Sequence, residues 1–184
     1  ARFQSGTMLG AAFGDNAPAI TKQVTEYADR FGMNKTEALQ QAAILRSTLP
    51  DSLFKDADIP RLMQTESIFG HQTGMTNEQI GRLNYALPQV AASPHLQGND
   101  WMQIANAAPG IVKPLLELTG AKNVADLKKM AQTMSGAEFA QLMIKAMDKL
   151  ASNAKVASAA MNSMQANLGR YQNAVQDGQV KFFD

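Results

Sequence analysis

Apolar residues recur along this chain at intervals of three and four positions. In residues 17–31 the apolar stripe comprises Ile20, Val24, Tyr27 and Phe31. This spacing places side chains on one face of an α-helix, whereas a half-buried strand would alternate apolar and polar residues. No segment shows such alternation clearly. We therefore predict an all-α fold whose first firm helix covers residues 17–31.

Capping residues and chain breakers divide the remaining apolar stripes into further helices. Thr76 with Gln79, for example, has the capping-box spacing, in which each side chain bonds the other residue's backbone N–H. The predicted N-caps are Asn16, Asn34, Thr76, either Asn99 or Asp100, Asn123 and Ser135. The predicted helix ends are Gly32, Pro50, Gly70, Pro109-Gly110 and Gly120. Pro88 lies within a predicted helix and should kink it.

The chain divides into three predicted parts. Residues 1–16 contain Gly6, Gly10 and Gly14, and three glycines inside a helix would cost about 3 kcal/mol. We therefore predict a flexible lead-in there, the alternative being a close helix-packing face. Residues 17–134, with their short capped helices, predict a compact helical domain.

Residues 135–184 predict a long helical arm. After residue 150 its apolar positions thin to a narrow seam of coiled-coil type. The seam comprises Val156, Ala160, Met164, Leu168, Tyr171 and Val175. A single rod over residues 136–176 would be about 60 Å long, at ~1.5 Å per residue. Such a rod needs a partner, which is either the preceding helices or another copy of the chain.

Composition excludes several classes of function. The formal net charge is +1, and the largest basic cluster is Lys128-Lys129, which is typical of a solvated helix face. We therefore predict no sequence-specific nucleic-acid partner. The absence of cysteine excludes disulfides, cysteine-ligated zinc and a thiol nucleophile. No apolar run reaches the ~18–20 residues needed to span a bilayer. Because the chain begins at Ala1 rather than methionine, we expect it to be part of a longer protein.

The two histidines, His71 and His95, do not form a metal-binding motif. His71 follows a predicted helix end, where a cation or a hydrogen-bond donor is favourable. His95 lies in a predicted turn and is expected to be solvated. No phosphate-binding glycine loop is present, so we predict neither a metal nor a cofactor.

One pair of residues, Glu66-Ser67, resembles part of a catalytic motif. Lytic transglycosylases, which cleave peptidoglycan, use a Glu-Ser pair on a helix, with the glutamate as general acid and base. The glycine-leucine-methionine-glutamine stretch that follows the pair in that family is missing after Ser67. Helical spacing places Glu66 opposite Leu62 and Phe69, so we expect it to face solvent. Glu66 is thus the single candidate catalytic residue, and the chain is predicted not to be an enzyme.

A longer stretch resembles the tape measure proteins of tailed phages. It begins Leu96-Gln97-Gly98-Asn99-Asp100-Trp101 and continues Ala108-Pro109-Gly110 before a short leucine-rich helix that ends at Gly120. Similar features are Gly32–Leu39 at the start of a paired helix, Met134–Phe139 at the start of another, and the serine- and asparagine-rich Ser158–Asn167. The resemblance covers about residues 17–176, and Asp51–Gly70 departs from it.

The resemblance implies a structural role in a virion. Proteins of this family fill the tail tube, set its length during assembly in the host cytoplasm, and leave it when DNA is ejected. The implied partners are the tail tube, the tail tip and an assembly chaperone, with possible self-association through the seam from Val156 to Val175. No catalytic residue belongs to this region of the family. The alternatives are a peptidoglycan-cleaving tail domain that uses Glu66 and a free-standing helical adaptor.

Overall fold

The computed structural model describes residues 2–152, all within helices or the short turns and loops that join them. No strand occurs among these residues, which confirms the predicted all-α class. The helices are α1 (Arg2–Phe13), α2 (Ala17–Phe31), α3 (Lys35–Thr48), α4 (Asp58–Gln72), α5 (Asn77–Ala92), α6 (Gly98–Ala107), α7 (Val112–Thr119), α8 (Val124–Gln132) and α9 (Gly136–Ser152). Two 3₁₀ turns, η1 (Gly14–Asn16) and η2 (Pro109–Ile111), connect neighbouring helices.

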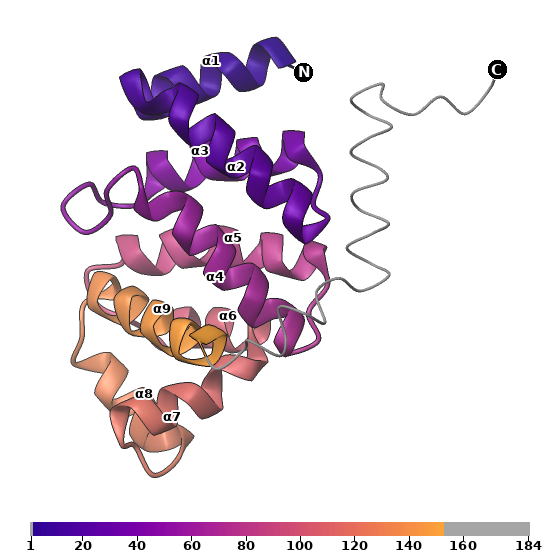
Figure 1. The fold of residues 1–184 in the computed structure, drawn as a ribbon. Coiled ribbons are helices and arrows are strands. Elements are labelled where there is room, and N and C mark those ends of the chain that lie inside the picture. Colours follow the sequence, from indigo (N-terminus) through magenta and orange to yellow (C-terminus); the bar gives the residue numbers. More distant parts are fainter. Residues whose placement is uncertain (1, 153–184) are drawn as a thin grey trace.

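Helices α4 and α5 lie at the centre of the fold. In Figure 1, α1–α3 form the upper part, α6–α8 form the lower part, and α9 lies across the middle. Helix α4 contacts α2, α3, α5 and α9, and helix α5 contacts α3, α4, α6 and α9. Their shared interior is apolar, with Ile59, Met63, Phe69, Ile80, Leu83 and Leu87 all fully buried. Side chains on several faces of α4 are therefore removed from water.

Four of the six predicted caps form as the sequence indicated. The Thr76 hydroxyl accepts a hydrogen bond from the Gln79 N–H at 3.2 Å, and the Gln79 side chain accepts one from the Thr76 N–H at 2.9 Å. The Asn34, Asn123 and Ser135 side chains each accept a hydrogen bond from the N–H three residues later. Each bond satisfies a backbone donor that the helix start would otherwise leave unpaired.

Two predicted caps are wrong. The Asn16 side chain makes no capping hydrogen bond to α2, and its Nδ2 donates to Asp56 Oδ2 at 2.8 Å. Asp56 and Asp51 also accept hydrogen bonds from Arg46 on α3, whose side chain is only 5% exposed. These bonds hold the connection of residues 49–57 against α3. Helix α6 begins two or three residues earlier than predicted, with Gln97 as its N-cap residue and the Asp100 carboxylate accepting from the Gln97 N–H.

Gly70 does not end α4, contrary to the prediction. The helix continues to Gln72, and a Cβ atom on Gly70 would lie 2.5 Å from Cγ1 of Ile80 on α5. Glycine is needed there because α4 and α5 approach closely. The chain reverses at Gly74, which has a φ of +79°, and the Met75 N–H bonds back to the Gly70 carbonyl.

The predicted flexible lead-in is also corrected. Residues 2–13 form α1, which packs on α2 and α3. Leu9 and Phe13, four positions apart, are 2% and 4% exposed. Burial of such side chains is worth about 1.5–3 kcal/mol each, which offsets the cost of glycine in a helix.

The predicted domain boundary at residue 134 is wrong. Helix α9 packs on α4, α5 and α7, and its Phe139, Met143 and Met147 are fully buried. Residues 136–152 therefore belong to the compact domain rather than to an arm. The seam from Val156 to Val175, on which the predicted long C-terminal helix depends, lies outside the described residues.

Candidate functional site

Glu66, the candidate acid, is fully buried, so the prediction that it faces solvent is wrong. Sequence spacing correctly placed Leu62 and Phe69 in the core. The opposite face of α4 is also covered, because α2, α5 and α9 all pack against this helix. Burial disfavours the charged form of a carboxyl group and raises the pKa of Glu66 well above its ordinary value.

Polar side chains from three other helices complete the surroundings of Glu66. Asn84 of α5 lies directly against the carboxyl group and is itself 3% exposed. Its Nδ2 donates to Oε1 of Gln41 on α3 at 2.9 Å. The neighbouring Ser67 shares a short hydrogen bond with the Tyr27 hydroxyl of α2. These residues form a polar cluster inside an otherwise apolar core.

Tyr27 contributes a second titratable group to the cluster. Its hydroxyl lies 2.7 Å from the sulfur of Met33, in addition to its contact with Ser67. Burial raises the pKa of Tyr27, the hydrogen bond with Ser67 lowers it, and the neighbouring Glu66 raises it further. Tyr27 is therefore neutral across the physiological range.

A raised pKa is a property of general acids, but catalysis also requires contact with a substrate. Grooves lie between α3 and α5, between α2 and α4, and between α4 and α9, and Glu66 lines none of these three. Tyr27 lines the groove between α2 and α4, so the cluster approaches the surface there through its tyrosine ring. The geometry thus seals the candidate acid inside the domain.

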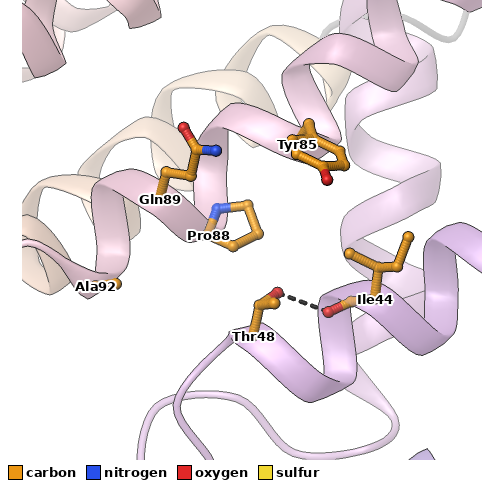
Figure 2. Close-up of a pocket in the computed structure, with 6 residues that line it drawn as sticks. All are labelled: Ile44, Thr48, Tyr85, Pro88, Gln89 and Ala92. Carbon is orange, nitrogen blue, oxygen red and sulfur yellow. Dashed lines mark hydrogen bonds between the residues drawn. The ribbon is translucent and has the colours of Figure 1, made fainter.

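The groove between α3 and α5 is the most apolar surface feature of the three. It has a volume of about 370 Å³ and lacks charged residues in its lining (Figure 2). The lining residues are Ile44, Thr48, Tyr85, Pro88, Gln89 and Ala92. The Thr48 hydroxyl donates to the Ile44 carbonyl at 2.6 Å, so its methyl group and the Ile44 side chain remain as apolar surface. Tyr85 is 61% exposed, which is unusual for a large aromatic ring.

The two histidines lie in different surroundings. His71 lies in the last turn of α4, where burial lowers its pKa and favours its neutral form. His95 is exposed in the turn before α6. Within residues 2–152, no group of three or more histidine or acidic side chains is arranged to hold a metal ion. No helix in this part of the chain is long and apolar enough to cross a membrane.

Sequence reasoning missed the residues that surround Glu66. Asn84 was the available signal, because it follows Leu83 within the apolar stripe of α5 and interrupts it with an amide. A polar residue at such a position often marks a buried hydrogen-bond partner. Tyr27 was assigned correctly to the core face of α2, but its hydroxyl partner on α4 is 40 positions away. Pairings at that separation leave no periodic pattern in the sequence.

These observations define the described chain as an all-α helical domain with a sealed polar cluster and an apolar surface groove. Comparison of the chain with protein-family models, with curated proteins and with solved structures finds no match.

Proposed function

We propose that the chain is a structural component of a phage tail, a segment of a tape measure protein. In this role it helps to set the tail length and contacts the tail tube, the tail tip or an assembly chaperone. It acts through protein–protein contacts and stays in the virion until DNA is ejected. The proposal rests on the resemblance of residues 96–120, and packing within that stretch supports it.

The stretch from 96 to 120 has a clear packing role. It forms α6, η2 and α7, and it contributes core residues to the domain: Leu96, Trp101, Ile104, Ile111 and Leu115. A Cβ atom on Gly110 would lie 2.7 Å from Cγ2 of Thr73, so the proline-glycine break allows η2 to approach the end of α4. The residues that carry the resemblance thus serve the architecture, which is the observation that favours a structural role.

The proposal predicts a change in tail length. In a phage that carries the gene, in-frame deletion of the codons for residues 17–152 should shorten the tail. The largest expected shortening is about 1.5 Å per deleted residue, which applies if the segment is a single extended helix in the tail. Electron microscopy of purified particles gives the length, and an immunoblot of the denatured particles should detect the chain. Tails of unchanged length in particles that lack the chain would contradict the proposal.

The groove between α3 and α5 is the described surface best suited to a partner's apolar side chain. Replacing the exposed Tyr85 with aspartate puts a charge where the partner would bury apolar surface. We expect the titre of infectious particles to fall at least tenfold while the melting temperature of the purified chain changes little.

Val124→Asp is the matched control, because Val124 is 40% exposed on α8 and lies outside the groove. It adds the same charge at the start of a helix, where an acidic residue is tolerated. Equal titres for the Tyr85 and Val124 variants would remove the groove from the proposed contact surface.

A further inference from the structure

The contact between Glu66 and Asn84 raises a question of hydrogen-bond chemistry. Asn84 Oδ1 lies 2.7 Å from Oε1 of Glu66 and is also close to Oε2. An ionised carboxylate only accepts hydrogen bonds, and so does an amide oxygen. Three acceptor atoms at these distances require a proton between them or a different orientation of the amide.

Rotating the Asn84 amide does not resolve the contact by itself. The rotation would turn its NH₂ group toward Glu66 but would place its oxygen 2.9 Å from Oε1 of Gln41, another acceptor. Gln41 would then also have to rotate, and an ionised carboxylate would remain in the core, paired with an amide in place of a cation. Such a buried charge costs several kcal/mol.

A proton on Glu66 resolves the contact with neither amide rotated. The Glu66 O–H donates to Asn84 Oδ1, and Asn84 Nδ2 donates to Gln41 Oε1 at 2.9 Å. On this path the Glu66 O–H and the Asn84 NH₂ group then each donate to an acceptor, as buried donors require.

We propose that Glu66 is held as a neutral carboxylic acid that donates its proton to Asn84, and that loss of this proton destabilises the packing of α4 on α5. The relay from Glu66 through Asn84 to Gln41 joins α4, α5 and α3, so one proton supports the contact of three helices. The stability of the core should therefore fall as pH rises. The inference does not depend on the proposed function.

Groups from the surrounding helices do not supply a compensating charge within the cluster. Asn84 from α5 and Gln41 from α3 are uncharged, and Tyr27 from α2 is neutral because its pKa is raised. From α9, Lys145 and Asp148 line the outer groove beside α4 instead of the buried cluster. Burial is accordingly the cause of the raised Glu66 pKa.

The direction of the pH effect depends on whether the folded or the unfolded chain binds the Glu66 proton more tightly. In the unfolded chain a glutamate loses its proton near pH 4.3, whereas folded Glu66 keeps it to higher pH. The contribution of Glu66 to stability is therefore complete below about pH 4.3. It falls as pH rises above that value, until the folded chain has also lost the proton. Within this window the folding equilibrium constant drops tenfold per pH unit from this group alone, which is about 1.36 kcal/mol.

Urea unfolding of the full chain as a function of pH tests the proposal. The variant Glu66→Gln keeps a neutral donor at the same place, so its stability should lack this contribution to the pH dependence. We expect the folding constant of the native chain, divided by that of Glu66→Gln, to fall about tenfold per pH unit above pH 4.3. Glu117→Gln, at an exposed position on α7, should follow the native profile. Parallel profiles for the native chain and Glu66→Gln would overturn the proposal.

A second measurement covers the case in which Glu66→Gln does not fold. In carbon-13 NMR spectra of the native chain, the carboxyl resonance of Glu66 should stay at its protonated position while the exposed glutamates titrate. Assignment comes from through-bond correlation of the carboxyl carbon to the backbone of Glu66. A Glu66 carboxyl that titrates together with the exposed glutamates would overturn the proposal without any variant of Glu66.

Discussion

Replacing Gly136 with alanine is expected to be among the most destabilising single changes in the domain. A Cβ atom at this position would lie 1.9 Å from the Val90 carbonyl oxygen and 2.5 Å from that of Ser93. Both obstacles are backbone atoms, and the Gly136 N–H is hydrogen-bonded to the Ser93 carbonyl at 2.9 Å. The start of α9 would have to move away from the end of α5. We expect a loss of about 3 kcal/mol or more in the free energy of unfolding, measured with urea.

The matched control is Gly98→Ala. Gly98 is the first residue of α6, as Gly136 is the first residue of α9, but no atom outside its immediate chain neighbours lies within 4 Å of its Cβ position. Alanine restricts the unfolded chain more than glycine does, so this change should be neutral or stabilising by about 0.4–1 kcal/mol. If the two variants were equally stable, the close approach of α9 to α5 would be wrong.

Phe139→Ala tests whether α9 belongs to the compact domain. The ring is fully buried and meets the Trp101 ring edge to face, with a centroid separation of 6.0 Å. Truncation removes apolar contact and leaves a cavity, which costs about 3–5 kcal/mol for a buried phenylalanine. Thermal unfolding followed by fluorescence of Trp101, the single tryptophan of the chain, measures the effect at the contact itself.

Leu118→Ala is the control for this truncation, because Leu118 on α7 is 36% exposed and should cost less than about 1 kcal/mol. A Phe139→Ala chain as stable as Leu118→Ala would mean that α9 does not contribute to the core. The domain boundary would then return to residue 134, where the sequence pattern placed it.

Many helix boundaries could be predicted from the sequence. The reciprocal bonds of Thr76 and Gln79, the side-chain cap at Asn34 and the left-handed Gly32 and Gly120 all depend on residues within four or five positions of one another. Apolar periodicity likewise identified the buried faces of α2 and α5. Such interactions depend only on neighbouring residues, so the sequence pattern is enough to predict these helix boundaries.

Residues with distant partners were interpreted less well. Asparagine often caps helices, yet the side-chain amide of Asn16 donates a hydrogen bond to Asp56, 40 positions away. Gly70 resembles a helix terminator, yet it lies within α4, where Ile80 occupies the space that a side chain would take. In both cases a local preference was real but a contact between helices outweighed it.

The sequence by itself determined that residues 2–152 are helical and where most of their helices begin and end, because capping and 3.6-residue periodicity act over a single turn. Only the tertiary structure decided which helix faces are covered. It drew α9 into the compact domain through Phe139 and enclosed Glu66 among α2, α4 and α5. Burial from all sides depends on the packing of several helices together. For this reason Glu66, which was expected at the surface, lies in the core beside Asn84.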